Sequence, residues 1–191
     1  MNLPNKITLA RVCMIPVFMI VLMCGANYEW ANYHIWSAII FAVASLTDGI
    51  DGHIARSRGL VTDFGKFMDP LADKLLVCTA LICFIQLDWI PAYMAVIIIA
   101  REFIVTGLRT IAASKGIVMA AIMTGKIKTV IQMIAIICTM VFAHGFSFLP
   151  DLGAVCGYPS IGFITMAVST VFTIYSGYEY IARNVDLIKD M

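Results

Sequence analysis

Residues 48–74 read DGIDGHIARSRGLVTDFGKFMDPLADK. This stretch holds a cluster of aspartates in a largely apolar chain, namely Asp48, Asp51, Asp69 and Asp73. Because carboxylates at the border of a membrane are costly, such a cluster requires a partner. Two divalent cations would balance the four charges, and carboxylate oxygens are ligands that suit magnesium or manganese.

The composition around this cluster is that of a membrane protein. Of the 191 residues, 61% are hydrophobic and 13% are charged, and the mean hydropathy is +0.93. Soluble domains are typically about 45–50% apolar and about 25% charged. We therefore expect an all-α protein that crosses the lipid bilayer several times, and we expect no nucleic-acid partner.

Apolar runs of the length that a bilayer requires, about 20 residues, occur in six places. The predicted spans are residues 8–25, 35–55, 69–87, 91–111, 125–144 and 159–181. Residues 3–8 are expected to form a short interfacial segment before the first span. Since neither an internal repeat nor a linker is visible, residues 1–191 are predicted to form a single domain.

The basic residues predict the orientation in the cell membrane. Of the 13 Lys and Arg residues, only Arg101 falls in the middle of a span. Residues 25–34, 86–91 and 143–160, the connectors on one side, contain neither Lys nor Arg. The positive-inside rule then places both termini and the aspartate cluster on the cytoplasmic side.

The aspartates fall on two helix faces that can meet. At about 100° per residue, the face of the first helix carries Asp48, Asp51, Gly52, Ala55 and Arg56. On the second helix, Gly65, Asp69 and Asp73 recur every four residues and share a face. The short connection between the two helices makes them antiparallel neighbours, so that two carboxylates from each would converge.

The other residues on these faces indicate the ligand. Gly52, Ala55 and Gly65 leave room for a bulky group beside the backbone, and Arg56 offers a rigid fork of donors suited to phosphate. With the carboxylates, they predict a diphosphate site with two metal ions. The alternative is a solvated helix end with ordinary ion pairs, which does not require four aspartates at this spacing.

The segment matches D-x2-D-G-x2-A-R-x8-G-x3-D-x3-D at every defined position and so resembles the CDP-alcohol phosphotransferase family. The resemblance implies six membrane helices, a homodimer, two magnesium or manganese ions, and displacement of CMP from a CDP-linked lipid or alcohol. The implied roles are metal ligation by Asp48, Asp51 and Asp69, ligation and general-base catalysis by Asp73, and CDP binding by Gly52, Ala55, Arg56 and Thr62.

Basic residues later in the chain bear on the acceptor. Arg101 and Glu102 lie within a span, where a charge needs a partner or a function. One possibility is an ion pair of Arg101 with a neighbouring helix. The other is a basic pocket for a phosphorylated acceptor, formed by Arg101, Arg109, Lys126 and Lys128.

A second resemblance favours one acceptor. The segments NLPNKITLAR (2–11), DFGKFMDPLADKLL (63–76), IIIAREFIVTGLR (97–109) and GKIKTVIQ (125–132) resemble those of bacterial phosphatidylglycerophosphate synthases. The resemblance implies transfer from CDP-diacylglycerol to glycerol 3-phosphate, with the acceptor phosphate on the four basic residues. Serine, inositol phosphate or phosphatidylglycerol remain alternative acceptors. An ion or proton carrier is a further alternative, but it should carry its charges near the midplane.

The N-terminal segment leaves two interpretations open. Asn5, Thr8 and Arg11 could reach the nucleotide or a lipid head group. Equally, Asn5 or Thr8 could cap a helix while Arg11 extends its charge to the interface.

Overall fold

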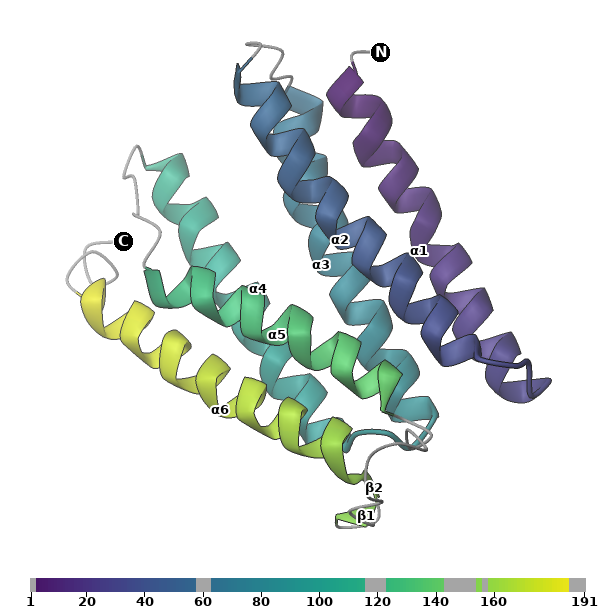
Figure 1. Cartoon of the computed structure of the whole chain (residues 1–191). Coiled ribbons are helices and arrows are strands. Elements are labelled where there is room, and N and C mark those ends of the chain that lie inside the picture. The colour runs from purple at the N-terminus through teal and green to yellow at the C-terminus, as the bar shows by residue number, and fades with distance from the viewer. Residues whose placement is uncertain (1–2, 58–62, 116–122, 143–153, 156–157, 186–191) are drawn as a thin grey trace.

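Six long helices make up most of the part of the chain that the structure describes (Figure 1). They are α1 (Leu3–Asn27), α2 (Tyr33–Ser57), α3 (Asp63–Gln86), α4 (Ala92–Ser114), α5 (Met123–Val141) and α6 (Ser160–Arg183). This computed structural model describes residues 3–57, 63–115, 123–142, 154–155 and 158–185. Side chains are described for residues 9–47, 71–72, 74–115, 123–142 and 161–185.

Each predicted apolar range corresponds to one helix, and their ends differ by a few residues. The start of α3 precedes the predicted residue 69, because hydropathy marks only the apolar part of a helix that continues through polar residues. Residues 3–8, expected as a separate segment, are helical and continuous with α1. An unexpected antiparallel pair, β1 (Ala154–Val155) and β2 (Tyr158–Pro159), precedes α6.

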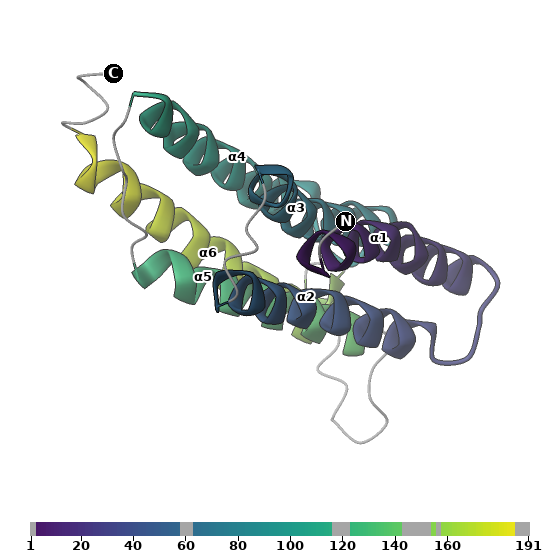
Figure 2. The ribbon, with the colours of Figure 1, turned by 90° about the horizontal axis from the view of Figure 1, so that it is seen from above.

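The helices form a closed ring in the order α1, α2, α5, α6, α4, α3, and α2 also contacts α3 (Figure 2). Consecutive helices run in opposite directions, and α1–α3 diverge from α4–α6 toward the side of the two termini (Figure 1). The end of α2, the start of α3, the end of α4 and the start of α5 all lie on that side. The fold thus gathers the segments that carry the predicted site residues at one end of the bundle.

The interior of the bundle is apolar and is shared by most of the helices. Fully buried side chains include Phe18 on α1, Phe41 on α2, Phe84 on α3, Ile98 on α4 and Ile136 on α5. These large side chains pack against one another, and in a bundle surrounded by lipid such close packing holds the helices together.

The outer surface of the bundle is also apolar. Every helix exposes large aliphatic side chains, for example Leu46 on α2 at 68% and Val171 on α6 at 66%. Soluble monomers rarely expose apolar patches of more than a few hundred Å². Within the described residues, Leu9–Asn27, Met123–Val141 and Ile161–Arg183 are long and apolar enough to cross a membrane. The prediction of an integral membrane protein built of helices is thereby confirmed.

Candidate active site

The four aspartates lie on two antiparallel helices that contact each other. Asp48 and Asp51 belong to the last turns of α2, and Asp69 and Asp73 belong to the first half of α3. The side chains of these aspartates, of Ala55 and of Arg56 lie outside the described part, as do the surroundings of Gly52, and Thr62 lies outside it altogether. A donor set of carboxylates on two contacting helices fits a hard divalent cation, and the individual roles stay predictions.

Arg11 ties α1 to α2 close to this cluster. Its side chain is only 2% exposed, and its Nε donates a hydrogen bond to the backbone carbonyl of Ala44 at 3.2 Å. Ala44 precedes Asp48 by about one helical turn. Arg11 therefore does not extend to the interface, because α1 packs against both α2 and α3 and encloses it.

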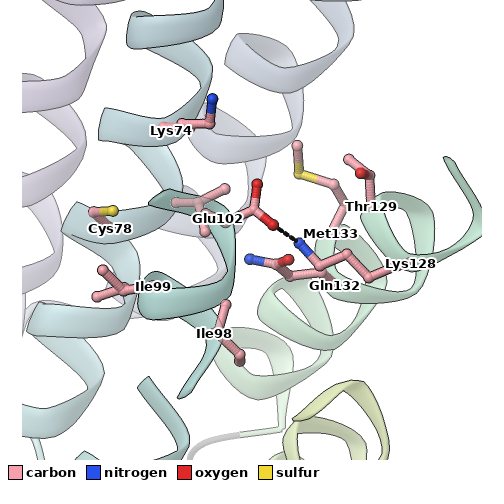
Figure 3. Close-up of a pocket in the computed structure, with 10 residues that line it drawn as sticks. Lys74, Cys78, Ile98, Ile99, Glu102, Lys128, Thr129, Gln132 and Met133 are labelled. Atoms are coloured by element: carbon pink, nitrogen blue, oxygen red, sulfur yellow. Dashed lines mark hydrogen bonds and ion pairs between the residues drawn. The ribbon is translucent and has the colours of Figure 1, made fainter. Parts of the chain in front are cut away.

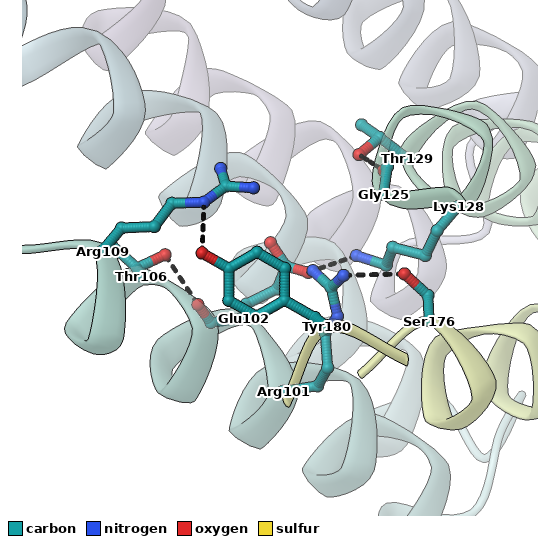
Figure 4. Close-up of polar contacts among 9 residues, drawn as sticks. All are labelled: Arg101, Glu102, Thr106, Arg109, Gly125, Lys128, Thr129, Ser176 and Tyr180. Carbon is teal, nitrogen blue, oxygen red and sulfur yellow. Dashed lines mark hydrogen bonds and ion pairs between the residues drawn. The ribbon is translucent and has the colours of Figure 1, made fainter. Parts of the chain in front are cut away.

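A carboxylate on α4 joins two cations that were expected to bind the acceptor. Lys128 on α5 donates through Nζ to Oε1 of Glu102, and Arg101 donates through Nη1 to the same oxygen at 3.1 Å (Figure 4). The side chain of Lys128 is 2% exposed. Since a buried cation without a counter-ion is strongly destabilising, Glu102 allows both charges to remain inside the bundle.

Arg101 extends this cluster to α6. Its Nη2 donates to Oγ of Ser176 at 2.9 Å. Gly177 permits the approach, since a Cβ at this position would lie 3.1 Å from Cγ of Arg101. The ion pair considered for Arg101 thus lies within its own helix, with Glu102, and Arg101 reaches α6 through the hydrogen bond to Ser176. The interhelical ion pair is that of Lys128 on α5 with Glu102 on α4.

Arg109 is held by a different partner on α6. Its guanidinium lies 5.1 Å from the ring centroid of Tyr180, and its Nε donates to the Tyr180 hydroxyl at 3.2 Å. Tyr180 is buried, whereas Arg109 is exposed. The two terminal nitrogens point away from Tyr180 (Figure 4). In this orientation they can form the two parallel hydrogen bonds by which a guanidinium binds phosphate. Lys126, at the start of α5, is exposed as well.

A small cavity of about 30 Å³ lies beside Glu102 (Figure 3). Its polar lining consists of Lys74, Glu102, Lys128, Thr129 and Gln132, and its apolar lining comes from α3, α4 and α5. Lys74 directly follows Asp73 in the sequence. One wall of the cavity is therefore α3, the helix that also carries Asp73, the predicted catalytic base.

Sequence reasoning did not assign a role to four of these residues. Glu102 and Gln132 had a usable signal, because each is a polar residue within an apolar helix and close in sequence to a basic residue. Ser176 and Tyr180 gave no such signal, since serine and tyrosine are common in membrane helices. Only the packing of α6 against α4 reveals that they bind Arg101 and Arg109.

Comparison with known proteins identifies the family. The sequence pattern of the family described as CDP-alcohol phosphatidyltransferase matches residues 1–175. A Bacillus subtilis protein named CDP-diacylglycerol--glycerol-3-phosphate 3-phosphatidyltransferase is 45% identical, over 98% of this chain and 97% of that protein. A protein of the same name from Rickettsia typhi is 36% identical over 94% of both chains. A probable phosphatidylglycerophosphate synthase from Mycobacterium tuberculosis H37Rv is 37% identical, over 95% of this chain and 81% of that protein. Given a match over most of its length and relatives that align nearly end to end, this chain belongs to the CDP-alcohol phosphatidyltransferase family.

Proposed function

We propose that this protein transfers the phosphatidyl group of CDP-diacylglycerol to glycerol 3-phosphate, giving phosphatidylglycerophosphate and CMP, a step of phospholipid biosynthesis. The observation that carries this proposal is the 45% identity to the Bacillus subtilis transferase along nearly the whole of both chains. The complete aspartate signature in residues 48–73 supports the same reaction class.

The donor site is assigned to the facing ends of α2 and α3. The proposed ligands of two divalent cations, Mg²⁺ or Mn²⁺, are Asp48, Asp51, Asp69 and Asp73. When bound, such ions would supply charge neutralisation to the diphosphate and to the CMP leaving group. The residues assigned to the CDP moiety are Gly52, Ala55, Arg56 and Thr62. Of these, the small residues admit the ligand and Arg56 binds phosphate.

Asp73 has a second role as the general base. It accepts the proton from the C1 hydroxyl of glycerol 3-phosphate, and that oxygen forms a bond to the phosphorus of the phosphatidyl group. The bond from this phosphorus to the CMP oxygen breaks, and CMP leaves with the electron pair. Lys74, which follows Asp73, lines the cavity beside Glu102, and this position favours an acceptor bound between α3, α4 and α5.

The acceptor phosphate is assigned to Arg109, Lys126, Arg101 and Lys128, of which two contact it directly and two act through their charge. Arg109 and Lys126 are exposed, so we assign them to direct contact with the phosphate. Arg101 and Lys128 already bind Glu102. They contribute positive charge near the phosphate without leaving their partner.

The enzyme is proposed to be a single domain with six membrane spans in the cell membrane. All six helices expose apolar side chains, and the basic residues favour an active site and both termini on the cytoplasmic side. Such a site is open both to water-borne glycerol 3-phosphate and to a lipid donor. The homodimer that the family resemblance implies is part of this proposal, and the mass of the purified protein in detergent tests it.

The decisive experiment measures CMP release by the purified protein with CDP-diacylglycerol and Mg²⁺. The acceptors to compare are glycerol 3-phosphate, serine, inositol 1-phosphate and phosphatidylglycerol. We expect release with glycerol 3-phosphate alone, its loss with a chelator, and its return with added Mg²⁺. Release with a different acceptor would contradict the assigned acceptor, and the absence of release from monodisperse, folded protein would contradict the reaction class.

A further inference from the structure

Two hydrogen-bond acceptors line the cavity beside Glu102 without a donor. Lys128 and Arg101 both bind Oε1 of Glu102, and among the described residues no donor reaches Oε2, which is turned away from Lys128 (Figure 3). Gln132, one turn after Lys128, is 3% exposed, and its Oε1 has no hydrogen-bond partner within the described part of the chain. Because buried polar atoms are almost always paired, the orphaned Oε1 of Gln132 indicates a missing donor.

The size and charge of the cavity define that donor. A volume of about 30 Å³ is on the scale of one water molecule or one hydroxyl group. A phosphate is disfavoured because the Glu102 carboxylate would repel it. An ammonium group is disfavoured because Lys74 and Lys128 line the same cavity. A neutral alcohol hydroxyl fits the space and can donate its single hydrogen bond to one of the two oxygens.

The place of the cavity connects it with the acceptor. The walls come from α3, α4 and α5, which also carry Asp73, Arg109 and Lys126. In the function proposed above, glycerol 3-phosphate presents its phosphate to the basic residues and its C1 hydroxyl to Asp73. Its C2 hydroxyl is then the donor that remains.

We propose that Glu102 and Gln132 form a subsite for the second hydroxyl of the acceptor, and that this subsite selects a phosphorylated vicinal diol over a phosphorylated simple alcohol. This inference rests on the proposed function. In this proposal the two oxygens of Glu102 have different partners. Oε1 accepts from Lys128 and Arg101, and Oε2 accepts from the second hydroxyl of the acceptor.

The test compares glycerol 3-phosphate with 3-hydroxypropyl phosphate, which keeps the phosphate and the primary hydroxyl but lacks the C2 hydroxyl. We expect the wild-type protein to favour glycerol 3-phosphate about tenfold or more in kcat/KM, as sites built to bind a hydroxyl do. In Gln132→Leu and Glu102→Gln this ratio should fall several-fold. The loss should occur with glycerol 3-phosphate, while kcat/KM for the analogue changes little in Gln132→Leu.

Glu179→Gln is the matched control, because Glu179 lies on α6, binds Arg183 and does not line the cavity. Its acceptor ratio should equal that of the wild type. Equal use of both acceptors by the wild-type protein would overturn the subsite, as would variants that slow both acceptors by the same factor. Both of these outcomes would leave the proposed function in place.

Binding of each acceptor without a lipid donor, measured by calorimetry, separates the two proposals. Tighter binding of glycerol 3-phosphate that Gln132→Leu removes would support the subsite even in a protein that releases no CMP, where the proposed function would fail. Equal binding of glycerol 3-phosphate and 3-hydroxypropyl phosphate, or binding of neither, would overturn the subsite.

Discussion

Asp73 is the residue whose substitution should separate chemistry from binding. Asp73→Asn removes the proton acceptor but retains an oxygen toward a bound cation, so we expect CMP release to fall by about 10²–10⁴-fold while CDP affinity changes little. The measurements are CMP release and CDP binding to the same preparation. Asp88→Asn is the control, since Asp88 is exposed at the opposite end of α3 and has a φ of 55°, which asparagine tolerates. Normal activity in Asp73→Asn would exclude this residue as the base.

Arg109 is expected to determine the affinity for the acceptor phosphate. Arg109→Ala removes an exposed guanidinium whose terminal nitrogens point away from Tyr180, so the KM for glycerol 3-phosphate should rise about tenfold and that for CDP-diacylglycerol much less. Steady-state kinetics with each substrate varied in turn measures both constants. Arg183→Ala is the control, because this arginine is 64% exposed and binds Glu179 on its own helix. An unchanged acceptor KM would remove Arg109 from the phosphate site.

Tyr180 should act on the acceptor through Arg109. Tyr180→Phe keeps the ring beneath the guanidinium but removes the oxygen that accepts from Nε, and the acceptor KM should rise about two- to fivefold. Tyr180→Leu also removes the cation–π contact and should have a larger effect. A thermal melt of each variant controls for lost packing. If both variants retain the wild-type acceptor KM, Tyr180 does not position Arg109.

Candidate site residues could be predicted where the residues that act together lie close in the sequence, and could not where their partners lie far away in it. The aspartates could be predicted because each pair lies within a single helix, where regular spacing determines the shared face. Glu102 lies 26 residues from Lys128, and Arg109 lies 71 residues from Tyr180. These pairs form only through helix packing, which no local pattern encodes. The four basic residues could therefore be proposed as candidates from sequence alone, whereas the carboxylate that binds Arg101 and Lys128 and the tyrosine that binds Arg109 could not.

At the scale of the helices, Gly25 determines how closely α1 and α2 approach. A Cβ on Gly25 would lie 2.8 Å from Cγ of Tyr33 and closer still to its Cβ, so Gly25→Ala must displace the buried start of α2. We expect a loss of about 1–3 kcal/mol in stability and a lower melting temperature, measured in detergent by fluorescence-detected size exclusion. A melting temperature equal to that of the wild type would contradict this packing.

Gly107→Ala is the matched control for this substitution. Gly107 lies in α4, and a Cβ there would meet no atom within 4 Å. Because alanine favours the helix, the expected change is a gain of up to about 1 kcal/mol. Opposite signs for the two substitutions would show that the effect at Gly25 arises from contact and not from helix propensity.

The helices were predictable as elements because apolar runs of membrane length have few other structures available to them. Their ends were not, as α3 shows, since Asp63 to Met68 are helical yet outside the apolar run. The strands β1 and β2 are only two residues each. Strands of that length have no periodicity that a sequence could display.

At the scale of the whole molecule, the distribution of charge predicts which end of the bundle faces the cytoplasm. Tyr28 lies in the turn after α1 and is 73% exposed, and Lys115 follows α4 and is exposed on the side of the termini. The helices α2, α3 and α4 separate the two positions. If all three span the membrane, Tyr28 and Lys115 must lie on opposite sides of it.

Cysteine labelling tests this topology in a variant whose six native cysteines have been replaced. A thiol reagent that does not cross membranes should label Tyr28→Cys in intact cells, because the connector after α1 lacks the basic residues that are retained in the cytoplasm. Lys115→Cys should react only after the cells are opened. The reverse pattern would place the aspartates outside the cell, away from cytoplasmic glycerol 3-phosphate. Labelling of both positions in intact cells would mean that an even number of spans separates them, which would contradict the six-span arrangement while leaving the helices themselves unchanged.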